Sequence, residues 1–373
     1  MNEKLIFIST GEASGDTIGG GLIEELRAQG YQGKIFGLGS KRTEDAGAVL
    51  LHDIKDWAAL GIYQSLKVVP KILRQYNKTK KWIKKNKPDL VIAVDFGFVN
   101  VKLLRNAKLF GCKTLYFMPP GAWRKNKQGA DLKDVSDVIA TPFEWSEKIL
   151  KQMGANVFWV GHPIKQLARK FETENRMFFV IMPGSRKHEY QNNLPVMAKA
   201  VNLLFEKEQD LKTGVLNFVM VASSTANVHE MQKLWSQFSK VQISIQQVPS
   251  FQFLKNGVVS LVCSGTATLE SAISKTPMVV VYRGDKIMEL EYRIRKPKFD
   301  YVALPSILLG KKVVPELIQW DATPERIAEE IGKLLSDSPE RRSQIQDFEE
   351  LEEVLGPDDA LTRTAKIALE LIN

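Results

Sequence analysis

The chain has 373 residues, a formal net charge of +9, 44% hydrophobic residues and 25% charged residues. These values are typical of a globular protein and exclude a mostly disordered, collagenous or disulfide-scaffold chain. The length predicts two domains, and no apolar run approaches the ~20 residues that a membrane-spanning helix needs. The two cysteines, Cys112 and Cys263, are expected to be buried free thiols in a reducing, cytoplasmic compartment.

Short apolar runs alternate with amphipathic stretches along the first part of the chain. Because the runs are apolar throughout, they are predicted to be strands of a parallel sheet that is buried on both faces. The alternation with helical patterns indicates a doubly wound α/β domain over residues 1–163. The predicted strands are Lys4–Thr10, Lys34–Gly39, Leu90–Asp95, Thr114–Met118, Val138–Thr141 and Val157–Gly161.

A turn of small residues, Gly11-Glu12-Ala13-Ser14-Gly15-Asp16, follows the first predicted strand. Such a turn allows a ligand to approach the backbone N–H groups at the start of a helix. It lacks the dinucleotide fingerprint and the Gly-Lys-Ser/Thr of a phosphate-binding loop. It is therefore either a ligand-binding turn or a tight strand–helix connection.

The segment 64–87 is strongly basic: it contains nine Lys or Arg side chains and no acidic one, whereas residues 321–360 contain 13 acidic and 4 basic side chains. Four apolar residues that are interleaved with the charges are expected to contribute to docking: Val68, Val69, Ile72 and Trp82. The segment is either an element that docks on an anionic membrane surface or a solvated surface helix. Its aromatic residues are too few to favour nucleic acid as the partner.

Asp95 ends a predicted core strand, which is where active sites lie in α/β sheets. Its carboxylate is either a general base or a cap on the next element. The histidines have no paired spacing and there is no cysteine pair, so we expect no metal site. His162, at the end of the first strand series, either lines a cleft or is structural.

The pattern then restarts after a polar stretch, 164–176, which is the best linker candidate. A second Rossmann-like domain is predicted over residues 177–345, facing the first across a cleft, and residues 346–373 are predicted to form a C-terminal helical segment. Thr323-Pro324 is a typical helix start. The second series of predicted strands is Phe178–Met182, Leu216–Ala222, Val241–Gln247, Val258–Cys263 and Met278–Tyr282.

Two turns in the second series are suited to anions. Pro183-Gly184-Ser185-Arg186 supplies a guanidinium that can bind phosphate bidentately. In Ser264-Gly265-Thr266-Ala267-Thr268-Leu269-Glu270, Gly265 and Thr266 are expected to start a helix whose N–H groups meet a diphosphate. Glu270, one turn further, is placed to accept both hydroxyls of a ribose. The alternatives are an exposed turn and a plain helix cap.

Together, these motifs resemble those of the bacterial lipid A disaccharide synthases, inverting glycosyltransferases with two Rossmann-like domains (the GT-B architecture). The resemblance extends from Gly11 to about Gln319 and includes the three turns, Glu189, Pro277–Arg283 and Asp300–Pro305. It implies transfer of 2,3-diacylglucosamine from UDP-2,3-diacylglucosamine to 2,3-diacylglucosamine 1-phosphate, giving lipid A disaccharide 1-phosphate and UDP. It also implies no cofactor and a peripheral position on the inner face of the cytoplasmic membrane.

The candidate site on this resemblance has a base, a donor side and an acceptor side. Asp95 is the expected base. The expected donor-binding residues are Gly184, Ser185, Arg186, Ser264, Gly265, Thr266 and Glu270. The expected residues of the cleft and acceptor side are Gly11, Glu12, Ser14, Asp16, Asn100, Trp123, Arg124 and His162.

The sequence departs from the family pattern on the acceptor side. The family's strand-end Asp is followed by Pro, Asp, Phe and Asn, whereas Asp95-Phe96-Gly97-Phe98-Val99-Asn100 keeps the first Asp and the Asn and lacks the second acid. The family's loop with two Trp and an Arg is shortened to Pro119–Arg124, and Gln64 and Ser306 replace a Glu and an Asn. A related UDP-sugar enzyme with another acceptor is therefore one alternative, and a non-catalytic nucleotide- or nucleic-acid-binding module is the other.

Overall fold

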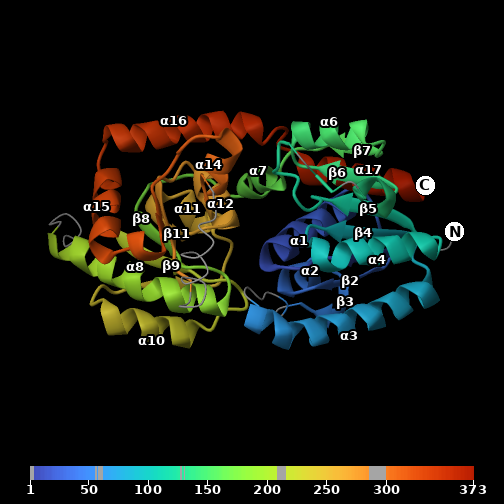
Figure 1. The fold of residues 1–373 in the computed structure, drawn as a ribbon, viewed down its shortest axis with the longest axis horizontal. Helices are drawn as coiled ribbons and strands as arrows, with labels where there is room; N and C mark the ends of the chain where they lie inside the picture. Colours follow the sequence, from blue (N-terminus) through green and yellow to red (C-terminus); the bar gives the residue numbers. More distant parts are fainter. Residues whose placement is uncertain are drawn as a thin grey trace. The chain divides into compact units, whose positions relative to one another are not determined.

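The computed structural model describes residues 4–54, 57, 62–126, 128–129, 131–207, 216–284 and 300–373, with residues 62–68 described by their backbone alone. The chain divides into two compact units, which we call unit 1 (Met1–Leu167 with Leu355–Asn373) and unit 2 (Ala168–Val354). Each unit contains one parallel sheet with helices packed on it (Figure 1). This confirms the predicted fold class of two Rossmann-like α/β domains.

The sheet of unit 1 has seven strands in the order β3-β2-β1-β4-β5-β6-β7, and all neighbouring strands are parallel. The strands are β1 (Ile6–Ser9), β2 (Ile35–Gly39), β3 (Val49–Asp53), β4 (Leu90–Val94), β5 (Lys113–Phe117), β6 (Val138–Thr141) and β7 (Val157–Trp159). The strand order reverses between β1 and β4, which is where ligands bind in open α/β sheets. β3 was missed in the sequence because it is a partly exposed edge strand, and Val49 on it is 56% exposed.

Strand residues of unit 1 alternate between two covered faces. Phe7, Val91 and Tyr116 share one buried cluster with residues of α3 (Ile62–Asn86) and α4 (Gly97–Leu109). Their neighbours Ile8 and Ile92 are fully buried and point to the other face, where α1 (Ala13–Ala28) and α17 (Ala360–Ile372) pack. The remaining helices of unit 1 are α2 (Lys41–Asp45), α5 (Leu132–Val135), α6 (Glu144–Gln152) and α7 (Pro163–Ala168).

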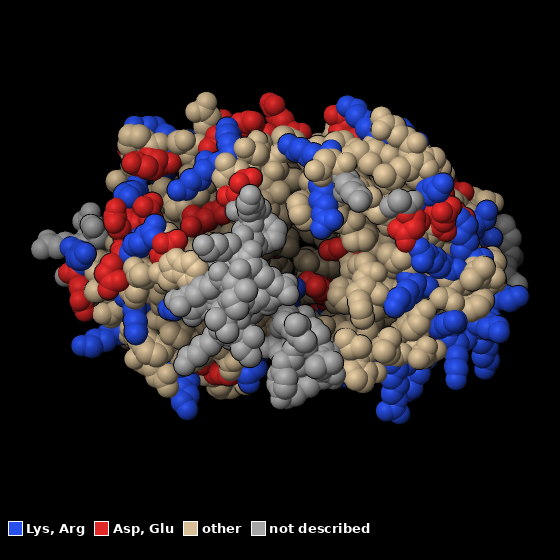
Figure 2. All heavy atoms as spheres, viewed as in Figure 1, with Lys and Arg blue, Asp and Glu red and all other residues tan. Residues whose placement is uncertain are grey.

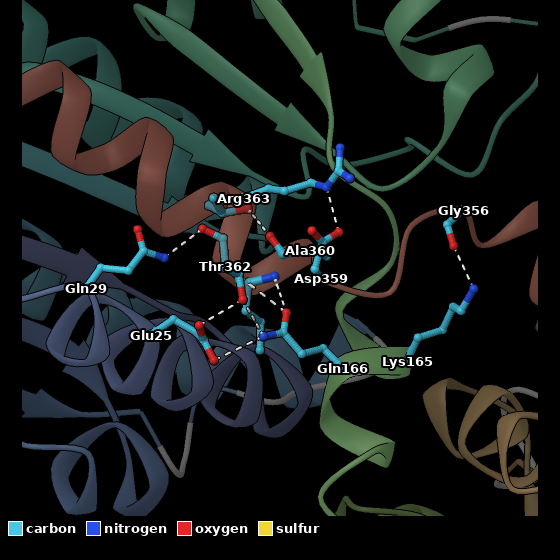
Figure 3. A network of polar contacts seen from close by, with 11 residues as sticks. Glu25, Gln29, Lys165, Gln166, Gly356, Asp359, Ala360, Thr362 and Arg363 are labelled. Carbon is cyan, nitrogen blue, oxygen red and sulfur yellow. Dashed lines mark hydrogen bonds and ion pairs between the residues drawn. The ribbon is translucent and has the colours of Figure 1, made fainter.

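The C-terminal helix α17 is fixed to unit 1 by the side chain of Gln166 from α7 (Figure 3). Its Oε1 accepts from the backbone N–H groups of Leu361 (2.7 Å) and Thr362 (3.3 Å), in the first turn of α17. Its Nε2 donates to Glu25 Oε1 (3.0 Å) and to Thr362 Oγ1 (2.8 Å), and Thr362 in turn donates to Glu25 Oε2 (2.8 Å). Gln166 therefore caps α17 and joins it to α1.

The predicted domain boundaries differ from the observed units in two places. The segment 346–373 is not one unit, because α16 (Pro339–Val354) belongs to unit 2 and α17 belongs to unit 1. The expected linker 164–176 includes most of α7, whose Lys165 Nζ donates to the carbonyl of Gly356 (2.6 Å). The physical reason is that α17 buries its apolar side, including Leu361 and Ala365, within unit 1.

The sheet of unit 2 has six parallel strands in the order β10-β9-β8-β11-β12-β13. They are β8 (Phe178–Met182), β9 (Asn217–Val221), β10 (Ser244–Gln246), β11 (Gly257–Cys263), β12 (Met278–Tyr282) and β13 (Glu316–Ile318). The first five were predicted, and β13 was missed because only three residues form it.

Helices cover both faces of this sheet. One buried cluster contains residues of α8 (Lys187–Lys207), α10 (Val228–Phe238) and α15 (Pro324–Leu335). The remaining helical elements described in unit 2 are α11 (Phe251–Leu254), α12 (Thr266–Ile273), α14 (Leu304–Leu309), the 3₁₀ turn Gln319–Asp321 and α16. The predicted helix start at Thr323-Pro324 is confirmed, because the Thr323 hydroxyl accepts from the N–H of Arg326 (3.3 Å) and Pro324 is the first residue of α15.

Both cysteines are buried and free, as predicted. None of the helices in the described part of the chain has the length and apolar character needed to cross a bilayer.

Candidate active site

Asp95 directly follows β4, where the strand order of unit 1 reverses. Its φ is +51° and that of Phe96 is +44°, so two successive non-glycine residues lie in the left-handed region. Such strained backbone is found where the surroundings over-determine it, often at functional sites. The Asp95 N–H donates to Phe117 O (3.0 Å). The Asp95 carbonyl accepts from Asn100 Nδ2 (2.9 Å) and from the Tyr116 hydroxyl (3.1 Å).

The carboxyl group of Asp95 has an environment that suits a base. Burial raises the pKa of this carboxyl, a hydrogen bond from the Phe96 backbone lowers it, and the negative charge of Glu12 raises it; the net result is a rise from 3.8 to about 6. Burial disfavours the charged form of an acid. A carboxylate with a pKa near 6 is still ionised at neutral pH and accepts a proton more readily than an ordinary Asp does.

The glycine-rich turn after β1 packs against the same strand end. A Cβ added at Gly11 would lie 1.9 Å from the ring of Phe96, so a larger residue at Gly11 displaces that ring. Glu12 follows and precedes α1, and its charge acts on Asp95. Ser14 is partly exposed in the first turn of α1. The structure therefore places Gly11 and Glu12 beside the expected base.

Asp16 has a different position from the one expected. It is buried, and its carboxylate accepts from the backbone N–H groups of Ser40 (2.6 Å), Arg42 (3.0 Å) and Thr43 (3.2 Å) and from the Thr43 hydroxyl (2.6 Å). These groups lie at the start of α2. Asp16 therefore caps the start of α2 and, as the last residue of the glycine-rich turn, anchors that turn to α2.

The loop that contains Trp123 and Arg124 lies next to α4. A Cβ at Gly97 would approach the ring of Pro120 within 2.8 Å. Trp123 is 41% exposed, and the Arg124 guanidinium lies 5.2 Å from its ring centre. Both side chains are thus accessible on a loop that touches the first residue of the helix after Asp95.

Phe98 lies in the segment Asp95–Asn100, which lacks the second acid of the family pattern. It is 51% exposed, and its ring lies 6.5 Å from that of Phe96 in an edge-to-face arrangement. Lys102 Nζ lies 5.6 Å from the centre of the Phe98 ring. An accessible aromatic residue therefore lies three positions after Asp95.

Asn100 and His162 were expected in the cleft, and the structure buries both. The Asn100 side chain bonds to the backbone of β1 and β4. His162 Nδ1 accepts from the N–H of Ile164 (3.3 Å), and the His162 N–H donates to Leu355 O (2.8 Å). The His162 ring also packs against that of Phe143, with 5.9 Å between ring centres. Both residues support the site from inside unit 1, and neither lines its surface.

His162 is expected to make the fold sensitive to acid. Burial lowers its pKa from 6.5 to about 3, so the folded state keeps the ring neutral while the unfolded chain takes up a proton below pH 6.5. The free energy of unfolding should therefore fall as pH falls from about 6.5 towards 3, by about 1 kcal/mol per pH unit. Urea unfolding at several pH values checks this. His162→Asn, which keeps an acceptor for Ile164, should show a weaker slope, and an unchanged slope contradicts the assignment.

The turn before α8 is organised around Glu189. Gly184 has φ +118°, and a Cβ there would lie 2.4 Å from Glu189 Cβ. Glu189 Oε2 accepts from the N–H groups of Ser185 (3.0 Å) and Arg186 (3.2 Å), and Oε1 accepts from the Arg186 guanidinium (2.7 Å). The Arg186 side chain is 19% exposed. The carboxylate therefore holds Arg186 in a fixed, mostly buried position at the end of β8.

The second expected donor turn starts α12. Gly265 has φ +140°, is exposed, and precedes the helix, and no side chain caps the helix start. The Ser264 hydroxyl donates to Val302 O (2.8 Å), which leaves it facing the segment before α14. N–H groups at such a helix start carry partial positive charge that favours an anion.

Glu270 lies in the second turn of α12. One of its oxygens accepts from the hydroxyl of Ser250 (2.6 Å). Burial raises the pKa of Glu270, and this hydrogen bond lowers it. The Glu270 carboxyl is thus held by Ser250, the residue that precedes α11.

Asn193 joins the two expected donor turns, and sequence reasoning missed it. It is fully buried in α8. Its Nδ2 donates to Pro183 O (2.9 Å) and to Cys263 Sγ (3.3 Å), and its Oδ1 accepts from the N–H of Arg283 (2.8 Å). Pro183 directly follows β8, Cys263 is the last residue of β11, and Arg283 directly follows β12. A polar residue on the buried side of α8, between Tyr190 and Met197, was the available signal.

Within the described residues, no group of three or more His, Cys, Asp or Glu side chains is placed to hold a metal ion.

A family model described as lipid-A-disaccharide synthetase matches residues 6–368. The chain belongs to this family. The membership confirms the resemblance seen in the motifs, and the protein is a glycosyltransferase of lipid A biosynthesis.

Curated relatives match along the whole chain. The lipid-A-disaccharide synthase of Syntrophus aciditrophicus is 33% identical over 388 residues, covering 100% of this chain and 99% of the relative. That of Trichlorobacter lovleyi is 31% identical over 384 residues, covering 99% and 98%.

Solved structures show the same fold at low identity. The UDP-GlcNAc 2-epimerase of Neisseria meningitidis bound to UDP-GlcNAc has a TM-score of 0.62 and 13% identity, covering 98% of both chains. The MurG of Acinetobacter baumannii has a TM-score of 0.52 and 15% identity, covering 99% of both chains. These likenesses support the architecture of two Rossmann-like domains.

Proposed function

We propose that the enzyme transfers 2,3-diacylglucosamine from UDP-2,3-diacylglucosamine to the 6-hydroxyl of 2,3-diacylglucosamine 1-phosphate. The products are the β-1,6-linked disaccharide 1-phosphate and UDP. The family membership supports this reaction, and the observation that carries the mechanism is Asp95, held at the switch point of unit 1 with a pKa raised to about 6.

In the proposed step, Asp95 accepts the proton of the acceptor hydroxyl. The acceptor oxygen forms a bond to the anomeric carbon of the donor sugar, and the bond from that carbon to the diphosphate breaks on the opposite side. UDP leaves with the bonding electron pair, so the anomeric configuration is inverted. A base in this position contributes about 10²–10⁴-fold to the rate.

Unit 2 has the groups that a UDP leaving group needs. The guanidinium of Arg186 and the uncapped start of α12 at Gly265 are the proposed partners of the diphosphate, where negative charge increases during the reaction. Glu270 is the proposed acceptor for the ribose hydroxyls. The donor residues Gly184, Ser185, Ser264 and Thr266 shape these two turns.

Acceptor specificity is tested by competition. Purified protein is incubated with UDP-2,3-diacylglucosamine and an equimolar mixture of 2,3-diacylglucosamine 1-phosphate, its dephosphorylated form and unacylated glucosamine 1-phosphate. We expect product almost entirely from the acylated phosphate. Preference for another acceptor supports the alternative of a related UDP-sugar enzyme, to which the absence of the family's second acid from Asp95–Asn100 points.

An anionic membrane surface is the proposed docking partner, and α3 is the element that supports it. Figure 2 shows Lys and Arg side chains projecting from the edge of unit 1 that carries α3, at the lower right. Asn77, Lys80, Lys81 and Lys84 line a shallow surface cavity of about 430 Å³. Among the described residues, none of these three lysines has an acidic partner within ion-pair distance.

Two of the four apolar residues that were expected to contribute to docking lie in the core of unit 1. Ile72 is buried. The Trp82 ring packs against the rings of Phe7 and Phe36, with 5.5 Å and 5.0 Å between the ring centres. These two side chains of α3 are therefore used in the core of unit 1, whereas Leu73 is 42% exposed. Val69 is partly buried, and the side chain of Val68 lies outside the described residues. Docking by α3 is consequently expected to be mainly electrostatic.

Replacing Lys78, Lys80, Lys81, Lys84 and Lys85 by Gln is expected to weaken binding to anionic liposomes at least tenfold. Each Lys near such a surface contributes about 1 kcal/mol, and only some of them touch it at once. Co-sedimentation with anionic and neutral liposomes at low and high salt checks this. The control variant has the same loss of charge on exposed, ion-paired lysines: Lys41, Lys148, Lys151, Lys275 and Lys311. Equal losses in the two variants, or equal binding to neutral liposomes, reject α3 as the docking element.

A further inference from the structure

We propose that Asn100 and Tyr116 are positioning residues that hold Asp95 in the backbone conformation in which its carboxylate acts as the base. The inference rests on the proposed role of Asp95. Neither residue is accessible to a substrate, because both are fully buried. They act on the same atom, the carbonyl oxygen of Asp95, from two different elements, α4 and β5.

The Asn100 amide connects the ends of the two strands that flank the switch point. Its Oδ1 accepts from the hydroxyl of Ser9, the last residue of β1 (2.7 Å). Its Nδ2 donates to Val94 O, at the end of β4 (3.0 Å), and to Asp95 O (2.9 Å), with Ser9 O further away at 3.3 Å. One side chain thus fixes β1, β4 and the residue that follows β4.

The backbone that receives these bonds is strained. Asp95 and Phe96 both have positive φ, which L residues adopt at a cost in free energy. Rotation of the peptide between them would take the Asp95 carbonyl away from Asn100 and Tyr116 together. The two donors therefore oppose relaxation of this peptide, and relaxation would redirect the carboxylate.

The chemistry of residue 100 is specific. The site needs a donor for two or three carbonyl oxygens and an acceptor for a hydroxyl, and an amide supplies both. A carboxylate would face the same carbonyl oxygens with negative charge, and an aliphatic residue would leave them without a partner. Tyr116 contributes only its hydroxyl, so Tyr116→Phe removes that donor and keeps the ring in the core.

Unit 2 also contains a buried Asn whose amide joins the ends of neighbouring strands, Asn193, and this residue provides a control. Asn193 is fully buried, and its amide ties together the chain after β8, the end of β11 and the chain after β12. It supports the turn that contains Arg186 and belongs to unit 2, whereas Asp95 belongs to unit 1. A change at Asn193 should therefore affect the donor and leave the base unaltered.

Two titratable side chains among the described residues interact with Asp95: Glu12 from the turn after β1 and Tyr116 from β5. The phenol is neutral and bonds to the backbone of Asp95, so its removal does not directly change the charge around the carboxyl. A lower pKa of the base in Tyr116→Phe would thus report movement of Asp95 into a better solvated place.

The test measures kcat and the donor and acceptor KM against pH for Tyr116→Phe, Asn100→Ser and Asn193→Ser, with folded fraction followed by circular dichroism. We expect kcat to fall about 3–10-fold in Tyr116→Phe and about 10–100-fold in Asn100→Ser, with donor KM within about twofold. The acid limb of the kcat profile should move to lower pH by about one unit, towards an ordinary Asp. Asn193→Ser should raise the donor KM and leave the acid limb in place.

The inference is overturned if both unit 1 variants keep the parental kcat and acid limb, or if kcat falls only in proportion to the folded fraction. Tyr116→Phe decides the question if Asn100→Ser does not fold. Asp95→Asn separates this inference from the proposed function. Full turnover in Asp95→Asn refutes the base itself, whereas an inactive Asp95→Asn with unaffected Tyr116→Phe and Asn100→Ser refutes positioning alone.

Discussion

Asp95→Asn is expected to lower kcat by about 10²–10⁴-fold while UDP binding stays unchanged. The amide keeps the shape of the carboxyl group and its backbone bonds to Phe117, Asn100 and Tyr116, and it removes the proton acceptor. Turnover with saturating donor and acceptor, together with UDP binding by calorimetry, measures the two effects separately. Near-parental turnover in this variant would mean that another residue is the base.

The same substitution is expected to stabilise the fold at alkaline pH. The pKa of Asp95 is raised from 3.8 to about 6 in the folded state, so the folded state holds a proton that the unfolded chain releases. The free energy of unfolding therefore decreases as pH rises from about 4 to 6, and the loss is complete above pH 6. Asp95→Asn should gain about 3 kcal/mol over the parent at pH 8 and little at pH 4. A gain that does not depend on pH would contradict this account of the carboxyl.

Arg186→Ala is expected to reduce kcat/KM by about 10²–10³-fold, with effects on both the donor KM and kcat. Arg186 is held by Glu189 and by the turn at Gly184 in a mostly buried position, so little ordering is needed when a diphosphate binds. Steady-state kinetics with varied UDP-sugar measures the effect.

The matched control for this prediction is Arg326→Ala. Arg326 lies in the same unit, is exposed and pairs with Asp321, so its loss changes the net charge equally without touching the turn. It should leave kcat/KM within about twofold of the parent, as for most surface substitutions. Equal losses at Arg186 and Arg326 would show that only the overall charge matters and would remove Arg186 from the donor site.

Much of the fold was predictable because it depends on local pattern. The buried strands β1, β4 and β12 read as continuous apolar runs, and Asp95 was identifiable as the residue that follows one of them. The apolar run of the edge strand β3 is followed by the polar residues His52 and Asp53, and β13 has only three residues, so both were missed. The return of α17 to unit 1 was not predictable, because its start is capped by Gln166, which is distant in sequence.

The supporting residues of the site were the hardest to predict. Asn100 and His162 have types common in binding sites, and only the packing shows that they are buried. Asp16 caps a helix whose start is 25 residues away at Lys41. Asn193 and Glu189 organise the donor turns from within a helix, and their roles depend on where β8, β11 and β12 end.

The most direct test of the central claim is mass analysis of the products made by the purified protein from UDP-2,3-diacylglucosamine and 2,3-diacylglucosamine 1-phosphate. The account predicts one molecule of UDP for each molecule of a disaccharide 1-phosphate that carries the acyl chains of both substrates, with a β-1,6 linkage. Release of UDP without this disaccharide, or formation of an α-linked product, would contradict it.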